Sequence, residues 1–271
     1  MSNLFDIKDK IIVITGGTGV LGSAIGKYLA TQGAQLVLIG RKFEVAQKLA
    51  DEINAANGKA MAIKADVTVE DDLQRVYDEI NTTFGRVDAL INAAGGNMPG
   101  AVVTPDQTLL DSDTDALRKI IELNYIGTYL PIKLLLPLFL KENKGSIINI
   151  SSMSAERPLT RVMGYSSSKA AIDNLTKWLA VEFAQKYGEG MRVNAVAPGF
   201  FLTVQNEKLL TNEDKSLTQR GDQIVSNTPM GRFGNPEELF GAVHWLCSDA
   251  SKFVTGTIIS VDGGFGAYSG V

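Results

Sequence analysis

Residues 10 to 22 read Lys10-Ile-Ile-Val-Ile-Thr-Gly-Gly-Thr-Gly-Val-Leu-Gly22, an apolar run that ends in closely spaced glycines. A short β-branched run of this kind is typical of a buried strand. From Val20 to Gln32 the apolar residues follow the spacing of a helix. The stretch therefore predicts a strand, a tight glycine turn and a helix, which is the first unit of an alternating α/β fold.

The same alternation continues along the chain. The other expected strands are 34–39, 59–64, 87–92, 145–150, 192–197 and 257–261, and the other expected helices are 42–56, 69–84, 113–140, 163–187 and 237–249. Strands that are apolar on both faces and are each followed by a helix indicate a parallel sheet covered on both sides. We therefore expect residues 1–271 to form a single Rossmann domain, a doubly wound parallel sheet of about seven strands with helices on both faces.

One polar stretch interrupts this alternation. Between Pro198 and Glu237 the chain lacks clear strand periodicity and is too long for an ordinary connection in a compact domain. Long loops of this kind often carry binding residues. We expect a substrate lid at about residues 200–235.

Composition and charge narrow the choice of partners. The chain is 45% hydrophobic and 21% charged, and its formal net charge is -4. A chain with this charge lacks the excess of basic residues that would bind nucleic acid or an anionic membrane surface. A small-molecule substrate is the better expectation. The N-terminal residues lack the apolar run of a secretory signal, and segment 129–140 is too short to cross a bilayer. We expect a cytoplasmic protein.

The single cysteine, Cys247, excludes an internal disulfide and a zinc-cysteine site within one subunit. His244 is the only histidine and lies in an expected helix, where a structural role is the simpler interpretation. We therefore expect no metal.

The glycine turn has the form of a phosphate-binding loop, because glycines let backbone N–H groups at a helix N-terminus approach a pyrophosphate. The expected cofactor contacts in this loop are Gly16, Thr18, Gly19, Val20, Leu21 and Gly22. At the end of the second strand, Arg41 stands where a carboxylate would hold the ribose 2′-hydroxyl of NAD(H). A guanidinium pairs well with a 2′-phosphate, so NADP(H) is favoured, although NAD(H) stays possible. A solvated arginine at a helix start is the alternative interpretation.

Tyr165 and Lys169 are four residues apart at the start of helix 163–187, which places them on one face. A tyrosine with a pKa of about 10 is a poor base, but a nearby ammonium stabilises the phenolate and lowers that pKa. Ser152, at the end of the preceding strand, is placed to donate a hydrogen bond to a substrate oxygen. Together the three residues predict proton transfer at an alcohol or carbonyl oxygen, although a tyrosine and a lysine four residues apart are, taken alone, more often a solvated helix face.

These features resemble the short-chain dehydrogenase/reductase family from about Lys10 to Gly264. The resemblance implies that Tyr165 is the general acid/base, that Lys169 binds the nicotinamide ribose and lowers the tyrosine pKa, and that Ser152 orients the carbonyl. It also implies that Asn124 supports a proton-relay water. The further cofactor contacts implied by matching segments are Asp66, Val67, Asn92, Ala93, Gly95, Pro198, Gly199 and Thr203. One departure is Val20, which stands where the family usually has a glycine.

Within the family, three stretches resemble the D-mannonate oxidoreductase (fructuronate reductase) group, namely 95–99, 198–206 and 261–271. This implies reversible conversion between D-mannonate and D-fructuronate. Arg157 and Arg161 lie between Ser152 and Tyr165, where either could clamp a carboxylate. Candidates for hydrogen bonds to the hydroxyls are Asn97, Gln205 and Asn206. A solvated polar loop is the alternative interpretation.

Other functions remain compatible with these motifs. Fold and catalytic residues do not separate this substrate from those of a 3-oxoacyl-[acyl-carrier-protein] reductase or a gluconate or polyol dehydrogenase. A regulator that binds the dinucleotide without turnover is a further alternative, but it would need no catalytic Tyr165. The family resemblance also implies a homotetramer assembled through the two long helices and the last strand.

Overall fold

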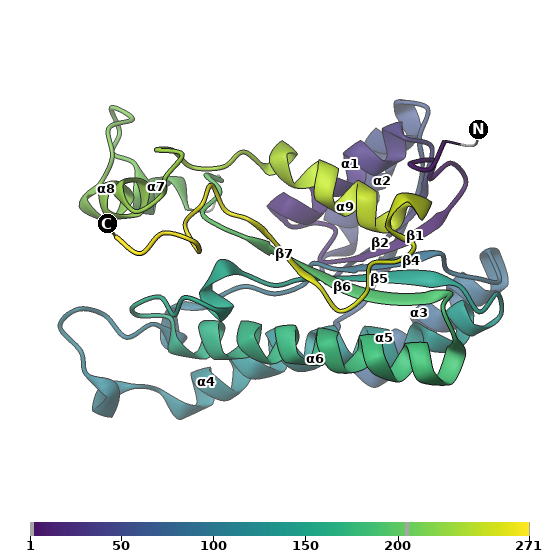
Figure 1. Ribbon diagram of the computed structural model, residues 1–271, viewed down its shortest axis with the longest axis horizontal. Helices are drawn as coiled ribbons and strands as arrows, with labels where there is room; N and C mark the ends of the chain where they lie inside the picture. The colour runs from purple at the N-terminus through teal and green to yellow at the C-terminus, as the bar shows by residue number, and fades with distance from the viewer. Residues whose placement is uncertain (1–2, 204–205, 271) are drawn as a thin grey trace.

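The strands form one parallel sheet in the computed structural model, which describes residues 3–203 and 206–270 (Figure 1). Their order across the sheet is β3-β2-β1-β4-β5-β6-β7, and all neighbouring pairs are parallel. The strands are β1 (Ile11–Thr15), β2 (Gln35–Gly40), β3 (Lys59–Lys64), β4 (Ala89–Asn92), β5 (Gly145–Ile150), β6 (Met191–Pro198) and β7 (Ile258–Val261). The prediction of a doubly wound parallel sheet is confirmed.

Helices cover both faces of this sheet (Figure 1). They are α1 (Val20–Thr31), α2 (Phe43–Ala55), α3 (Glu70–Thr83), α4 (Thr114–Ile121), α5 (Gly127–Leu140), α6 (Met163–Tyr187), α7 (Glu207–Leu210), α8 (Gln219–Ser226) and α9 (Phe240–Cys247). Apolar residues of α1, α2 and α9 pack with Ile12 and Ile14 of β1, whereas those of α3, α5 and α6 pack with Ile11 and Val13. Because successive side chains of a strand point to opposite faces, β1 supplies both cores.

The order of the strands reverses beside β1, which pairs with β2 on one side and with β4 on the other. In doubly wound sheets the ligand crevice opens beyond the carboxyl ends of the strands at such a point. The turns that follow β1 and β4 touch there. The buried Thr15 hydroxyl accepts a hydrogen bond from the Ala94 N–H at 3.2 Å, and Gly16 has a φ of +63°. A Cβ on Gly16 would lie 2.6 Å from the Ala94 nitrogen, so this position requires glycine.

The expected helix at 113–140 is continuous but irregular. Between α4 and α5, residues Glu122–Ile126 form a π-helical turn, which contains the fully buried Asn124. By length and composition alone, Thr114–Leu140 would be long and apolar enough to span a membrane. Half of its most apolar window is buried inside the protein, however, as expected for a helix that packs against a sheet.

The polar stretch after β6 folds as an excursion from the sheet, and we refer to residues 200–235 as the lid. It carries the short helices α7 and α8, which lie beyond one end of the sheet (Figure 1). Its two ends meet, because the Leu202 N–H donates to the Gly234 carbonyl at 3.1 Å and the Gly234 N–H donates to the Phe200 carbonyl at 2.9 Å. The lid is therefore closed at its base by backbone hydrogen bonds.

His244 joins three parts of the chain. From α9 its ring nitrogens lie 3.0 Å from the Tyr28 hydroxyl of α1 and 2.7 Å from the Phe5 carbonyl. These contacts confirm the structural role expected for this histidine.

Replacing Gly22 with alanine is expected to disturb the glycine turn, because the new methyl carbon would lie 2.4 Å from the Gly16 carbonyl oxygen. Overpacking of this kind typically costs about 1–3 kcal/mol, and we expect the free energy of unfolding to fall by that amount. Urea unfolding would measure the change. Gly26→Ala is a matched control, since its methyl group would meet only side-chain atoms, at 3.5 Å or more. Equal stability of the two variants would contradict the expectation.

Candidate active site

A cleft of about 460 Å³ runs from the glycine turn to the N-terminal end of α6. Most of the predicted site residues line it: Gly19, Val20, Leu21, Gly22, Ala93, Gly95, Asn97, Ser152, Tyr165, Lys169, Pro198, Gly199, Thr203 and Asn206. The segments after β1, β4, β5 and β6 and the first turns of α1 and α6 bring these residues together, although they are far apart in sequence. Gly96, Ile150, Ser151, Phe200 and Phe201 also line the cleft and were not among the predicted contacts.

Other predicted cofactor residues lie around this cleft rather than in its lining. Thr18 lies against Gly40, where an added Cβ would be 2.9 Å from the threonine methyl group, and the neighbouring Arg41 is exposed. Asp66 accepts hydrogen bonds from the backbone N–H and the hydroxyl of Thr68, two residues before α3. The buried Val67 packs against Gly127. Gln205 lies outside the described residues.

Asn92 has a structural environment that differs from the predicted cofactor contact. It is buried, and its amide nitrogen donates to the Asn149 side chain at 2.9 Å. Asn149 in turn donates to the Thr176 hydroxyl of α6 at 2.9 Å. This chain of hydrogen bonds connects β4, β5 and α6. In this arrangement Asn92 therefore holds together the elements that carry the cleft.

Asn124 holds the loop that follows β4. Its side-chain oxygen accepts from the Gly96 N–H at 3.0 Å, and its nitrogen donates to the carbonyls of Gly96 and Ile120, both at 2.9 Å. The loop fits tightly, because a Cβ on Gly95 would lie 2.7 Å from the Asn124 oxygen. Asn124 is thus committed to the backbone, and the inferred contact with a relay water stays a prediction.

Tyr165 and Ser152 face each other at the centre of the cleft. Burial raises the pKa of Tyr165 above its ordinary value of 10.0, and the Ser152 hydroxyl opposes this only in part. The net shift of this pKa is upward because burial is the largest effect, and the lowering of the Tyr165 pKa by Lys169 stays a prediction. The Ser152 oxygen accepts from the Ser154 N–H at 3.1 Å, and its hydroxyl group contacts Tyr165.

Lys169 is buried beneath the tyrosine. Its Nζ donates to the Ile150 carbonyl at 2.6 Å and lies 5.6 Å from the centroid of the Tyr165 ring. Burial lowers the pKa of this ammonium to about 8, against the opposing charge of Asp173. An ammonium in a buried site is costly unless it is hydrogen-bonded, and the Ile150 carbonyl meets part of that need.

Asp173 is one turn beyond Lys169 on α6 and was not among the predicted site residues. Burial raises the pKa of its carboxyl group, while the Ser151 hydroxyl and the charges of Lys177 and Lys169 oppose the shift. The spacing of Tyr165, Lys169 and Asp173 at four-residue intervals is visible in the sequence and could have indicated this group.

Two of the predicted substrate residues are bound to the protein itself. The Nε of Arg157 donates to the Gly266 carbonyl at 3.0 Å. The Asn206 side chain accepts from the Thr203 N–H and donates to the Phe201 carbonyl, both at 2.8 Å, so it shapes the first turn of the lid. Asn97 is exposed at the edge of the cleft.

Arg161 lies on the loop before α6, and an unpredicted arginine of the lid accompanies it. Arg161 has a left-handed φ of +74°, an unusual conformation for this residue type, and its carbonyl accepts from the Val103 N–H at 3.0 Å. Burial and the nearby charge of Arg161 lower the pKa of the half-buried Arg220 of α8. Among the described residues 3–203 and 206–270, neither guanidinium has a carboxylate within ion-pair distance.

Comparison with known proteins gives the family. A family model described as Enoyl-(Acyl carrier protein) reductase matches residues 18–266. The uncharacterized oxidoreductase UxuB of Bacillus subtilis is 44% identical, and the match covers 98% of each chain. The protein is a short-chain dehydrogenase/reductase.

Two crystal structures resemble this short-chain dehydrogenase/reductase over nearly its whole length. One, from Haemophilus influenzae and named a "putative D-Mannonate oxidoreductase", contains bound NAD; it is 43% identical, with a TM-score of 0.92 and 98% of each chain covered. The other is a gluconate 5-dehydrogenase from Burkholderia cenocepacia in complex with NADP and tartrate; it is 29% identical, with a TM-score of 0.86 and 98% of each chain covered.

The short-chain dehydrogenase/reductase is therefore an oxidoreductase that uses a nicotinamide cofactor. The cleft fits such a group. At Gly22, Gly95 and Gly199, which line the cleft, and at the neighbouring Gly16, an added Cβ would lie 2.4 to 2.7 Å from other protein atoms, so the backbone is closely packed at these positions. Glycines at such positions let backbone N–H groups approach a pyrophosphate.

We expect the rate of ketone reduction to fall as the pH rises through about 8, because Lys169 loses its proton in that range. Tyr165, with its raised pKa, stays protonated beyond this point. The measurement is the pH dependence of kcat/KM at saturating cofactor. Lys169→Arg keeps a positive charge at high pH, so any activity it retains should lack this decline. A wild-type profile that stays level well above pH 8 would contradict the assignment.

Proposed function

We propose that this enzyme interconverts a secondary alcohol and a ketone on a sugar acid, most specifically D-mannonate and D-fructuronate. The observation that carries the proposal is the pair Arg161 and Arg220, on the loop before α6 and on α8 of the lid, which lie near each other outside the lining of the cleft and have no carboxylate partner among the described residues. Guanidinium groups in such a position suit a substrate carboxylate. The likeness to a structure named for D-mannonate supports the same substrate.

In this proposal Tyr165 donates its proton to the carbonyl oxygen during reduction and takes it back during oxidation. Its raised pKa keeps the phenol protonated at neutral pH, which suits the reductive direction. Ser152 donates a hydrogen bond to the same oxygen as negative charge develops on it. Lys169 holds the nicotinamide ribose, and Asn124 fixes the loop at Gly96 against which the ring would lie. The bound cofactor supplies or accepts the hydride.

The other proposed cofactor contacts follow the cleft. Gly16, Thr18, Gly19, Val20, Leu21 and Gly22 would approach the pyrophosphate, Asp66 and Val67 the adenine, and Ala93, Gly95, Pro198, Gly199 and Thr203 the nicotinamide half, while Asn92 would act only through its hydrogen bond to Asn149. Arg41 is exposed at the end of β2, and we propose that it favours NADP(H) by pairing with the 2′-phosphate. NAD(H) remains the alternative, and the similar crystal structures include one of each.

The setting and assembly are also proposals. We place the enzyme in the cytoplasm, in keeping with its single, buried cysteine. A homotetramer through the long helices is supported by Trp178 and Val181, two apolar side chains of α6 that are 59% and 58% exposed.

The first test is a spectrophotometric assay of the purified protein with D-fructuronate, run separately with NADPH and NADH. We expect rapid reduction that is faster with NADPH, and a loss of about 10²-fold or more in Tyr165→Phe, since the phenol is the proton donor. Arg41→Gln should reduce the preference for NADPH over NADH. Turnover only with an acetoacetyl thioester would favour a 3-oxoacyl-[acyl-carrier-protein] reductase, and turnover only with gluconate a polyol dehydrogenase.

The second test concerns the two arginines. Removing a hydrogen-bonded charge costs about 1.5–3 kcal/mol, so Arg161→Gln and Arg220→Gln should each raise KM for the sugar acid by about 10- to 100-fold. KM for a neutral ketose of the same length should not change. Arg118→Gln is the control, because this exposed arginine of α4 pairs with Asp115 on its own helix. Equal effects on charged and neutral substrates would exclude a carboxylate contact.

A further inference from the structure

The last residues of the chain fold around one carboxylate. After β7, Asp262 accepts hydrogen bonds from the Gly264 N–H at 2.9 Å and from the Gly266 N–H at 2.8 Å. Gly263 and Gly264 have φ values of +64° and +89°, which a residue with a side chain would adopt only under strain. We refer to Asp262–Tyr268 as the tail. The Asp262 carboxylate therefore fixes the path of the tail from within.

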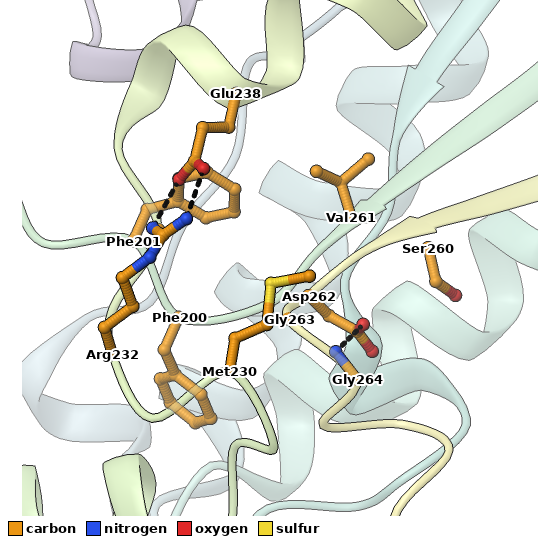
Figure 2. A pocket seen from close by; sticks show the side chains of 11 residues that line it. Phe200, Phe201, Met230, Arg232, Glu238, Ser260, Val261, Asp262, Gly263 and Gly264 are labelled. Atoms are coloured by element: carbon orange, nitrogen blue, oxygen red, sulfur yellow. Dashed lines mark hydrogen bonds and ion pairs between the residues drawn. The ribbon is translucent and has the colours of Figure 1, made fainter.

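The tail is attached to the C-terminal part of the lid. The Met230 N–H donates to the Gly263 carbonyl at 3.1 Å, and Gly264 packs closely against the Pro229 ring. Figure 2 shows that Met230, Asp262 and Gly264 border one cavity of about 410 Å³. On its other side, Arg232 forms a two-pronged ion pair with Glu238, with N···O distances of 2.8 and 2.6 Å. The end of the lid is thus held from two directions.

The tail is attached to the catalytic machinery as well. Its Gly266 carbonyl accepts the Arg157 Nε hydrogen bond, and Arg157 belongs to the loop between Ser152 and Tyr165. The Phe265 ring meets the Phe200 ring edge to face, with centroids 5.2 Å apart and an interplanar angle of 62°. Phe200 lines both the cleft and the cavity of Figure 2. One short segment therefore contacts the lid at both ends and the catalytic loop.

The tail also packs closely against the end of β6. A Cβ on Gly199, the residue that leads from β6 into the lid, would lie 2.6 Å from the Asp262 Cα. The tail therefore packs directly against the residue that leads into the lid.

We propose that the tail is a positioning element of the active site, in which Asp262, Phe265 and Arg157 hold the lid and the catalytic loop in a fixed relation. The role assigned to Arg157 is therefore attachment to Gly266, in place of direct contact with a substrate carboxylate. The inference rests on the proposed function only in the choice of substrate for the kinetic test.

The test compares Phe265→Ala with the wild type by hydrogen–deuterium exchange of the full-length protein. Loss of an aromatic contact should raise exchange in peptides from the lid and from residues 153–161 by up to about tenfold. KM for D-fructuronate should rise by a similar factor, while the Kd for the reduced cofactor changes less than about twofold. A purely structural defect would instead weaken the binding of both the substrate and the cofactor. Phe265→Tyr should restore wild-type behaviour, and Phe253→Ala, which removes a fully exposed ring before β7, should have no effect.

Asp262→Ala provides a second variant with the same expected pattern, because it leaves two N–H groups of the tail without an acceptor. Unchanged exchange in both segments for both variants would overturn the proposal, whatever the substrate is. If exchange rises as expected but the wild type does not reduce D-fructuronate, the positioning role stands and the proposed function fails.

Discussion

The hydrogen bond from Lys169 to the Ile150 carbonyl is the interaction on which the active site depends. It places a buried ammonium at the carboxyl end of β5 and so fixes the start of α6 against the sheet. Tyr165 lies one turn before the lysine, and Ser152 follows two residues after Ile150, so both are positioned by this one contact. Because burial is costly for the ammonium, its pKa falls, and the position of α6 becomes coupled to the protonation of one side chain.

Much of this arrangement could be predicted from sequence because it depends on local patterns. The strands are apolar on both faces, and α6 was predicted with the bounds that the structure gives, residues 163 to 187. The four-residue spacing of Tyr165 and Lys169 fixes their shared face in any helix. Even the unusual Val20 could be placed, since the flanking Gly19 and Gly22 define the same turn.

What could not be predicted depends on contacts between distant parts of the chain. Arg157 was interpreted from its neighbours in sequence, yet its partner Gly266 is more than a hundred residues away. Arg220 was overlooked because nothing in a polar lid marks one arginine as lying near another. The burial that raises the tyrosine pKa could not be predicted either, because sequence spacing reveals a neighbouring charge but does not reveal the extent of burial.

The closed base of the lid has a consequence for how such enzymes diversify. Phe200 and Gly234 are joined by a backbone hydrogen bond, so the two ends of the segment between them lie side by side. Insertions, deletions or replacements between such adjacent ends disturb the rest of a domain little. The lid can therefore be exchanged as a module during evolution, so that, under the proposed function, a new substrate range can arise while Ser152 and Tyr165 stay unaltered.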